Sequence, residues 1–237
     1  MNLIIYLIKE MKIKHYSIFN YHENSKIDWD FLRNSKKEPE YYIPQTEGEY
    51  KSIINENKYK DIVETTLNYI DSNKLDTILS LGSGRAILEY QLKFKTGIKT
   101  IISDVTKSIL RLKKFNYFDE VLLIDITKQI NIKISKKSIV LLPRIDTELT
   151  DNQIKQLFKN LHRKGVNYIL FIPAQLISFK SIVIQIYILL KALIYKTPLV
   201  DCGYSRSRGR FKKLWEEFYD VHKNYNFKYL FLINKNI

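Results

Sequence analysis

Two glycines separated by one serine are the residues of this chain best suited to ligand chemistry. Gly82 and Gly84 stand in the stretch TILSLGSGRAILEYQL, where an apolar run gives way to a helical pattern. The chain of 237 residues has only 7 glycines. Glycine leaves the main chain free of side-chain bulk, so a ligand can press against it and a turn can adopt dihedral angles closed to other residues. The pattern predicts a strand, a ligand-binding turn and a helix in succession.

Acidic residues follow the next two apolar runs at matching places. Asp104 ends IISD about 20 positions after the glycines, where a carboxylate can accept hydrogen bonds from ribose hydroxyls. Asp125 ends VLLID, where a carboxylate can hold the exocyclic amine of an adenine. Ligands of open α/β sheets bind outside the carboxyl ends of the strands. Three strand ends therefore converge on a ligand that contains adenosine.

Two adenosine-containing cofactors compete for such a site. A dinucleotide site has a third glycine in the spacing G-x-G-x-x-G, and Ile87 occupies that place here. A dinucleotide-binding unit also usually starts near the beginning of its domain, whereas here the unit begins near Leu75. Both observations disfavour a nicotinamide cofactor without excluding it.

The elements that must position these residues alternate between strand-like and helix-like runs from Leu75 onward, which predicts an α/β fold with a mostly parallel sheet flanked by helices. The clearest helix signal is TDNQIKQLFKNLHRKG, where Thr150 and Gln153 have the spacing of a capping box and Gly165 is placed to end the helix. The last expected strand is FKYLFLI, and little sequence is left for a partner strand beside it.

At these motifs the chain resembles the class I S-adenosylmethionine-dependent methyltransferases. ILSLGSGRA is similar to the glycine-rich first motif of that family, IISDVT to its ribose-binding acidic motif and VLLIDIT to its adenine-binding segment. The resemblance runs from Leu75 to Pro173 and more loosely to the C-terminus. It implies a Rossmann-like methyltransferase fold and S-adenosylmethionine as the cofactor.

The resemblance also implies which residues hold the cofactor. The glycine stretch would lie against the methionine part, the first acidic residue on the ribose and the second with its neighbour around the adenine. The implied cofactor-binding residues are Ser80, Gly82, Ser83, Gly84, Asp104, Asp125 and Ile126.

Three positions depart from the family pattern. Ser80 stands where the family commonly has an acidic residue, and Ala86, preceded by the bulky Arg85, stands where it commonly has a third glycine. Arg85 could fold over the site and block it, or pair with an acidic neighbour and stay clear. A relic of the methyltransferase fold that acts as a non-catalytic binding module is therefore an alternative to an enzyme.

Catalytic residues are less defined by the sequence, because methyl transfer chiefly requires that the acceptor be aligned with the methyl group. The candidate bases are His22, in the N-terminal region, and Asp146, near the mouth of the fourth strand. LLPRIDTE lacks the Asn/Asp-Pro-Pro-aromatic motif of enzymes that methylate DNA base nitrogens, and Cys202 follows an aspartate rather than a proline, unlike a cytosine C5 nucleophile. With a single cysteine, neither a disulfide framework nor a Cys-rich metal site is expected.

The formal net charge of +14 points to an anionic partner, although the lysines are spread along the chain as a compositional bias would spread them. The one dense basic stretch is SRSRGRFKK. Tyr204, Arg206 and Arg208 are the candidate substrate-binding residues there, because arginine binds phosphate through two parallel hydrogen bonds.

Residues 176–195 predict a helix with one apolar face, flanked by Lys180 and Lys191. Core packing, the surface of a homodimer and an in-plane membrane helix remain open for it. The face consists of Phe179, Ile182, Val183, Ile186, Leu190 and Leu193.

Four parts are expected along the chain. They are an N-terminal helical cap or lid (1–73), the cofactor-binding Rossmann-like core (74–174), an insertion with the amphipathic helix and a basic loop (175–210), and a helix and strand that complete the core (211–237). The apolar stretch at the start is too short to span a bilayer and has no cleavage pattern, which predicts a cytoplasmic protein, peripheral to the inner face of the membrane if the helix lies there. The expected reaction is methyl transfer to the hydroxyl of a small molecule or a glycan. The glycan could be linked to a lipid or a phosphate, and RNA is the rival acceptor.

Overall fold

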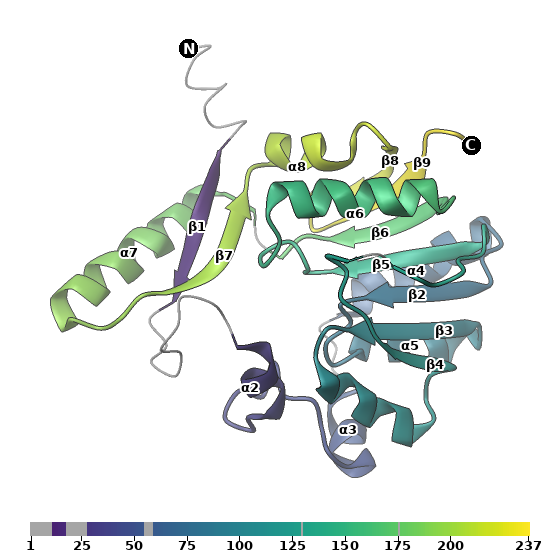
Figure 1. The fold of residues 1–237 in the computed structure, drawn as a ribbon, viewed down its shortest axis with the longest axis horizontal. Coiled ribbons are helices and arrows are strands. Elements are labelled where there is room, and N and C mark those ends of the chain that lie inside the picture. Colours follow the sequence, from purple (N-terminus) through teal and green to yellow (C-terminus); the bar gives the residue numbers. More distant parts are fainter. Residues whose placement is uncertain (1–10, 18–27, 55–58, 129, 175) are drawn as a thin grey trace.

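The computed structural model describes residues 11–17, 28–54, 59–128, 130–174 and 176–237. Within them a seven-stranded sheet forms the centre of the molecule, in the order β4-β3-β2-β5-β6-β9-β8 (Figure 1). A separate two-stranded sheet lies to one side of it.

The strands of the large sheet are mostly parallel. β2 pairs in parallel with β3 and β5, β3 with β4, and β5 with β6, whereas β9 is antiparallel to β6 and β8. The chain runs outward from β2 through β3 to β4 and then returns to the other side of β2, so a topological switch point lies at β2. The strands are β2 (Thr77–Leu81), β3 (Lys99–Asp104), β4 (Glu120–Leu123), β5 (Ser138–Pro143), β6 (Tyr168–Ile172), β8 (Tyr219–Tyr225) and β9 (Tyr229–Asn234).

Helices cover both faces of this sheet. α6 (Asp151–Arg163) and α8 (Arg208–Trp215) pack on one face, and α4 (Lys60–Ser72) and α5 (Ile87–Thr96) pack on the other (Figure 1). The inner strands are buried along nearly their whole length, as expected for continuous apolar runs covered on both sides. The predicted capping box at Thr150 is confirmed, and four apolar residues of α6 are buried.

A hairpin closes the sheet, which corrects the expectation of a single C-terminal strand. FKYLFLI contains β9, as predicted, but the residues before it form β8 rather than a longer helix. β8 is an edge strand whose middle residues are exposed, and the alternation of apolar and polar residues in its sequence YDVHKNY breaks at Lys223. With four polar residues among seven, this short pattern was not recognised as a strand.

The N-terminal region is not a purely helical cap. It contains β1 (Lys12–Ser17), α2 (Trp29–Asn34) and α3 (Glu47–Ile53). β1 pairs antiparallel with β7 (Val200–Arg206), and α7 (Phe179–Tyr195) packs on β1. These three elements, β1, α7 and β7, form a side lobe at one end of the molecule (Figure 1). The expected parts 1–73 and 175–210 are thus joined through this sheet.

Candidate functional site

The glycine loop joins β2 to α5 at the carboxyl edge of the sheet. Gly82 and Gly84 have φ angles of 81° and 57°, in the left-handed region that favours glycine. The amides of Gly82 and Ser83 both donate to the carbonyl oxygen of Ser103 in β3, at 2.9 and 2.8 Å. A Cβ atom on Gly82 would lie 2.6 Å from Cγ2 of Ile145. Both the backbone angle and the lack of space therefore require glycine at position 82.

Asp104 lies at the end of β3 and binds the glycine loop. Its Oδ2 accepts a hydrogen bond from the amide of Gly84 at 2.9 Å. Its Oδ1 accepts from the amide and the hydroxyl of Thr106, each at 3.0 Å. The guanidinium of Arg33 lies 3.7 Å from Oδ2, and Asp104 is only 4% exposed. The carboxylate thus holds loop and strand together beneath an arginine.

Arg33 comes from α2 and covers the loop, a contact that no sequence pattern predicted. A Cβ atom on Gly84 would lie 2.8 Å from Nη2 of Arg33. Nη1 donates to the carbonyl oxygen of Tyr41 at 3.2 Å, and the ring centroid of Trp29 is 5.0 Å from Cζ. Burial lowers the pKa of Arg33, although the charge of Asp104 acts to raise it. The buried Nε has no hydrogen-bond partner among the described residues.

Arg85 contacts a different part of the chain. Its Nη1 donates to the carbonyl oxygen of Pro39 at 2.9 Å, which holds the segment before α3. The covering position over the loop, considered for Arg85 because it adjoins Gly84, is taken by Arg33 instead. Arg33 and Gly84 lie far apart in the chain, so their contact leaves no local signal in the sequence.

Ser80 is buried and pairs with a carboxylate that sequence reasoning also missed. Its hydroxyl donates to Oε1 of Glu89 at 2.6 Å. Glu89 lies in the first turn of α5 and is 1% exposed, and this burial raises its pKa to about 7. Position 80 lacks the acidic residue that the resemblance leads one to expect, yet a carboxylate lies one hydrogen bond away from it.

Asp125 and Ile126 follow β4 beside the end of β3. The amide of Ile124 donates to the carbonyl oxygen of Asp104 at 2.9 Å, which brings the two strand ends together. Oδ1 of Asp125 accepts from the amide and the hydroxyl of Thr127 at 3.0 and 2.6 Å. The hydroxyl contact is the largest cause that lowers the pKa of Asp125. Ile126 is half-buried and packs against the core.

Asp146 is fully buried after the end of β5. Its Oδ1 accepts a hydrogen bond from the amide of Ala174 at 2.8 Å, whereas its Oδ2 has no hydrogen-bond partner among the described residues. Burial raises the pKa of Asp146 to about 6. The other candidate base, His22, lies outside the described residues.

Arg206 is fully buried, which corrects its predicted role in binding substrate. Nε donates to Oδ1 of Asp151 at 2.8 Å. Nη1 and Nη2 donate to the carbonyl oxygens of Asp146 and Leu149. All three nitrogens of the guanidinium are therefore engaged inside the protein. Arg206 fastens β7 to the loop after β5 and offers no exposed donor to a phosphate.

Tyr204 and Arg208 are more accessible. Nζ of Lys12 lies 3.9 Å from the ring centroid of Tyr204, whose amide donates to the carbonyl oxygen of Thr147 at 2.9 Å. Arg208 is exposed at the start of α8, with its Cζ 5.3 Å from the ring centroid of Phe227. Their role in binding substrate stays a prediction.

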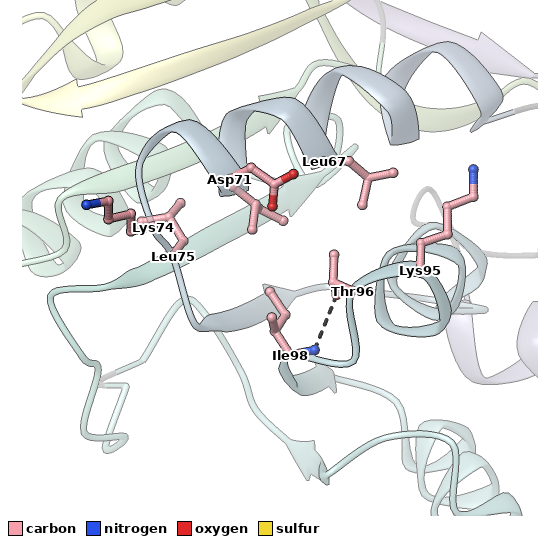
Figure 2. A pocket seen from close by; sticks show the side chains of 8 residues that line it. Leu67, Asp71, Lys74, Leu75, Lys95, Thr96 and Ile98 are labelled. Atoms are coloured by element: carbon pink, nitrogen blue, oxygen red, sulfur yellow. Dashed lines mark hydrogen bonds between the residues drawn. The ribbon is translucent and has the colours of Figure 1, made fainter.

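A surface hollow lies at the opposite edge of the sheet. It is lined by the ends of α4 and α5 and by Leu75 and Ile98, which precede β2 and β3 (Figure 2). Lys74 and Lys95 stand at its two ends, and the amide of Ile98 donates to Oγ1 of Thr96 at 3.3 Å. Because the glycine loop is at the carboxyl edge, this hollow is separate from the candidate site.

The described part of the chain contains neither a metal centre nor a membrane-spanning helix. In the described part of the chain, no group of three or more His, Cys, Asp or Glu side chains is arranged to hold a metal ion. No helix there is long and apolar enough to cross a membrane.

Solved structures of methyltransferases are similar to this architecture. Magnesium protoporphyrin IX methyltransferase from Synechocystis PCC 6803, with bound S-adenosylmethionine, matches with a TM-score of 0.55 and 10% identity over 92% of this chain and 100% of that one. The chain has the fold of the class I S-adenosylmethionine-dependent methyltransferases. The predicted Rossmann-like fold with a mostly parallel sheet is thereby confirmed.

Two other methyltransferase-fold structures are longer than this chain. The mitomycin 7-O-methyltransferase MmcR matches with a TM-score of 0.56 and 13% identity over 87% of this chain and 60% of that one. Human N-acetylserotonin methyltransferase, in complex with S-adenosylmethionine, matches with a TM-score of 0.53 and 15% identity over 80% of this chain and 57% of that one. No family model and no curated protein matches the sequence. At such identities the likeness establishes the fold.

Proposed function

We propose that the protein is an S-adenosylmethionine-dependent methyltransferase acting on a small-molecule or glycan-type hydroxyl. The observation that carries the proposal is the glycine loop at the switch point, tied through the Gly84 amide to Asp104 at the end of the neighbouring strand. Similar structures with this fold hold S-adenosylmethionine, and one of them is named for methylation of an oxygen. When bound, the cofactor would supply a methyl group activated by a sulfonium.

The residues present fit that cofactor once Arg33 leaves the loop. The partners of Asp104 within hydrogen-bond distance belong to the loop and to Thr106, whereas Arg33 at 3.7 Å lies beyond the ordinary limit of about 3.2 Å. Leaving the buried Nε of Arg33 unpaired costs roughly 1 to 3 kcal/mol. A ligand with ribose hydroxyls would therefore displace the Arg33 guanidinium, whose Nε has no hydrogen-bond partner among the described residues, and would donate hydrogen bonds to the Asp104 carboxylate in its place.

The remaining cofactor contacts follow from the same edge of the sheet. The loop from Gly82 to Gly84 would hold the methionine part, and Asp125 with Ile126 would bound the adenine. Ser80 and Glu89 lie beneath the loop as a hydrogen-bonded pair. Burial raises the pKa of Glu89 to about 7, so its carboxyl group would change protonation near neutral pH.

Asp146 is the base that we propose for the acceptor hydroxyl. It follows β5, the strand that pairs with β2 and so lies next to the glycine loop. With a pKa of about 6, its carboxylate is mostly ionised at neutral pH and is a better proton acceptor than an ordinary aspartate. Its unpartnered Oδ2 is the atom that would receive the proton. Because Asp146 is fully buried, the acceptor must open the loop around it.

A glycan-type hydroxyl carried on a phosphate-linked lipid is the acceptor that we favour. Arg208 offers an exposed cation close in sequence to β7, and α7 in the same side lobe exposes an apolar face. RNA is the second candidate, since a net charge of +14 would also serve a phosphate backbone. The contact between Arg33 and Asp104 supports a third possibility, a binding module without turnover.

Titration calorimetry of the full chain with S-adenosylmethionine and with NAD tests the cofactor. We expect S-adenosylmethionine alone to bind, and Asp104→Asn to weaken it about tenfold through loss of a charged acceptor. Asp119→Asn is the matched control, because Asp119 also accepts a hydrogen bond from a backbone amide, that of Thr100 at 2.6 Å. Asp119 precedes β4, so it lies at the amino edge of the sheet, away from the glycine loop. Binding of NAD alone, or equal losses in both variants, contradicts the assignment.

Turnover separates an enzyme from a binding module. The protein is incubated with S-adenosylmethionine and fractions of lipid-linked glycans, small molecules or RNA, and release of S-adenosylhomocysteine is measured. We expect release with a hydroxyl-bearing fraction and its loss in Asp146→Asn, with cofactor binding retained. Stoichiometric binding without release on any fraction favours the binding module.

A further inference from the structure

α7 exposes most of its apolar side chains and buries its uncharged polar ones. The buried residues of this helix are Ser181, Gln185 and Ala192. A surface helix of a globular protein has the reverse arrangement, with an apolar stripe on the core. The large apolar side chains of α7 that are between 41% and 84% exposed are Phe179, Val183, Ile184, Ile186, Tyr187, Leu189, Leu190, Leu193, Ile194 and Tyr195.

Polar contacts with β1 fix this orientation. Oε1 of Gln185 accepts a hydrogen bond from the amide of Tyr16 at 3.1 Å, and Nε2 of Gln185 contacts Nδ1 of His15. Ser178 and Ser181 cap the start of the helix through a capping box. Rotating α7 to bury its apolar side would break the contacts of Gln185, so the apolar side faces outward.

The outward face is too wide for one partner helix. At about 100° per residue, the exposed apolar positions from Leu189 through Phe179 to Tyr195 span an arc of roughly 240°. The seam between two paired helices uses a much narrower stripe. α7 lies at one end of the molecule (Figure 1), and its broad apolar face fits a planar surface instead.

The charged residues of this helix are all lysines. Lys180 and Lys191 lie within the exposed arc, between Tyr187 and Ile184, and Lys196 follows at the end of the helix. No Asp or Glu occurs in the sequence between Asp151 and Asp201. Lysines beside an apolar face are attracted to anionic headgroups while the apolar side chains enter the acyl boundary.

We propose that α7 docks in the interface of an anionic lipid bilayer. A helix that lies in the membrane interface usually turns its polar face to water. In α7 the polar face packs on β1 instead, so the rest of the protein lies on the aqueous side of the bilayer. This docking stands independently of the proposed methyl transfer, and a lipid-linked acceptor would rest on both.

The docked lobe is attached directly to the candidate site. A Cβ atom on Gly203 of β7 would lie 1.8 Å from the carbonyl oxygen of Thr147, so β7 runs against the loop after β5. Arg206 binds the carbonyl oxygen of Asp146 in the same loop. Docking through α7 would therefore bring the carboxyl edge of the sheet to the side of the protein that carries the membrane contact.

Flotation with vesicles tests the proposal. The full chain is mixed with phosphatidylcholine vesicles that contain or lack phosphatidylserine. We expect flotation with the anionic vesicles, and a loss of at least about tenfold in Ile186→Asp/Leu193→Asp. Phe94→Asp is the matched control, because Phe94 on α5 is 78% exposed, much like Leu193 at 77%, and should float as the parent does. Lys180→Glu/Lys191→Glu should weaken binding about fivefold per lysine.

The same variants can overturn the proposal. Lys180, Ile186, Lys191 and Leu193 are not buried, so the aspartate and glutamate variants are expected to fold. Circular dichroism checks this. A parent that does not float, or a double aspartate variant that floats equally well, refutes membrane docking. A parent that sediments as a dimer, becomes monomeric in Ile186→Asp/Leu193→Asp and never floats would show that a second copy covers the face.

Discussion

α6 and α7 start alike and bury opposite kinds of side chain. Each begins with a capping box, formed by Thr150 with Gln153 in α6 and by Ser178 with Ser181 in α7. α6 lays its apolar side on the seven-stranded sheet, whereas α7 lays a polar side on β1. The buried residues of α6 are Ile154, Leu157, Phe158 and Leu161.

The difference lies in the surface beneath each helix. The large sheet presents apolar side chains on both faces, and burying them against α6 stabilises the fold by the hydrophobic effect. β1 has the sequence KIKHYS and offers a backbone amide and a histidine to α7. A helical pattern with one apolar side therefore predicts a helix, but it does not predict which surface that apolar side contacts.

The largest expected contrast is between core truncations on the two helices. Phe158→Ala in α6 should lower the free energy of unfolding by about 3 to 5 kcal/mol, because Phe158 is fully buried among aromatic rings. Leu193→Ala in α7 should change it by less than about 0.5 kcal/mol. Urea denaturation measures both. Equal losses would mean that α7 is covered in solution.

The buried carboxylate of Glu89 in α5 should lower the free energy of unfolding by an amount that depends on pH. Burial raises the pKa of Glu89 from 4.5 to about 7, so the proton stabilises the folded state, fully below about pH 4.5 and no longer once the pH rises through about 7. The shift corresponds to a cost on the order of 3 kcal/mol above pH 7.

Glu89→Gln should remove that cost while keeping an oxygen for the Ser80 hydroxyl. Its free energy of unfolding should exceed that of the parent increasingly as the pH rises from about 4.5 to about 7. Urea denaturation across that range provides the measurement. A constant difference between variant and parent would mean that Glu89 titrates normally.

The polar contacts under α7 should matter less but measurably. Gln185→Leu leaves the amide of Tyr16 without its acceptor and should cost about 1 to 3 kcal/mol. Gln156→Leu on the exposed side of α6 is the matched control, with a change below about 0.5 kcal/mol. Hydrogen exchange at Tyr16 should quicken in the first variant alone. Unchanged exchange would show that α7 is oriented by something other than Gln185.

The smallest expected effect concerns another poorly satisfied polar group, Arg33. Arg33→Ala should tighten binding of S-adenosylmethionine about fivefold, because the cofactor no longer has to displace the guanidinium. Arg85→Ala is the control, since Arg85 contacts the carbonyl oxygen of Pro39 instead. Calorimetry decides between two roles: weaker binding in Arg33→Ala would make Arg33 part of the cofactor contacts rather than a cover.

Local patterns in the sequence predicted the elements that depend on neighbouring residues. The turn at Gly82 and Gly84 and the capping box at Thr150 are confirmed, because each depends on backbone angles and contacts within a few positions. Asp104 lies at the end of β3 as expected, since its place follows from where an apolar run stops. The edge strand β8 was missed because its exposed residues are mostly polar and its alternation of apolar and polar residues is short and broken at Lys223.

The sequence by itself determined the alternation of strands and helices from β2 to β6, the glycine turn and the acidic residue that faces it. Only the tertiary structure decided that Arg33 lies on that turn, that Arg206 is enclosed and that α7 turns its apolar side outward. These outcomes join residues far apart in the chain, such as Arg206 and Asp146, which are 60 positions apart. Such contacts depend on which surfaces the whole fold brings together, and no local pattern of residues encodes that choice.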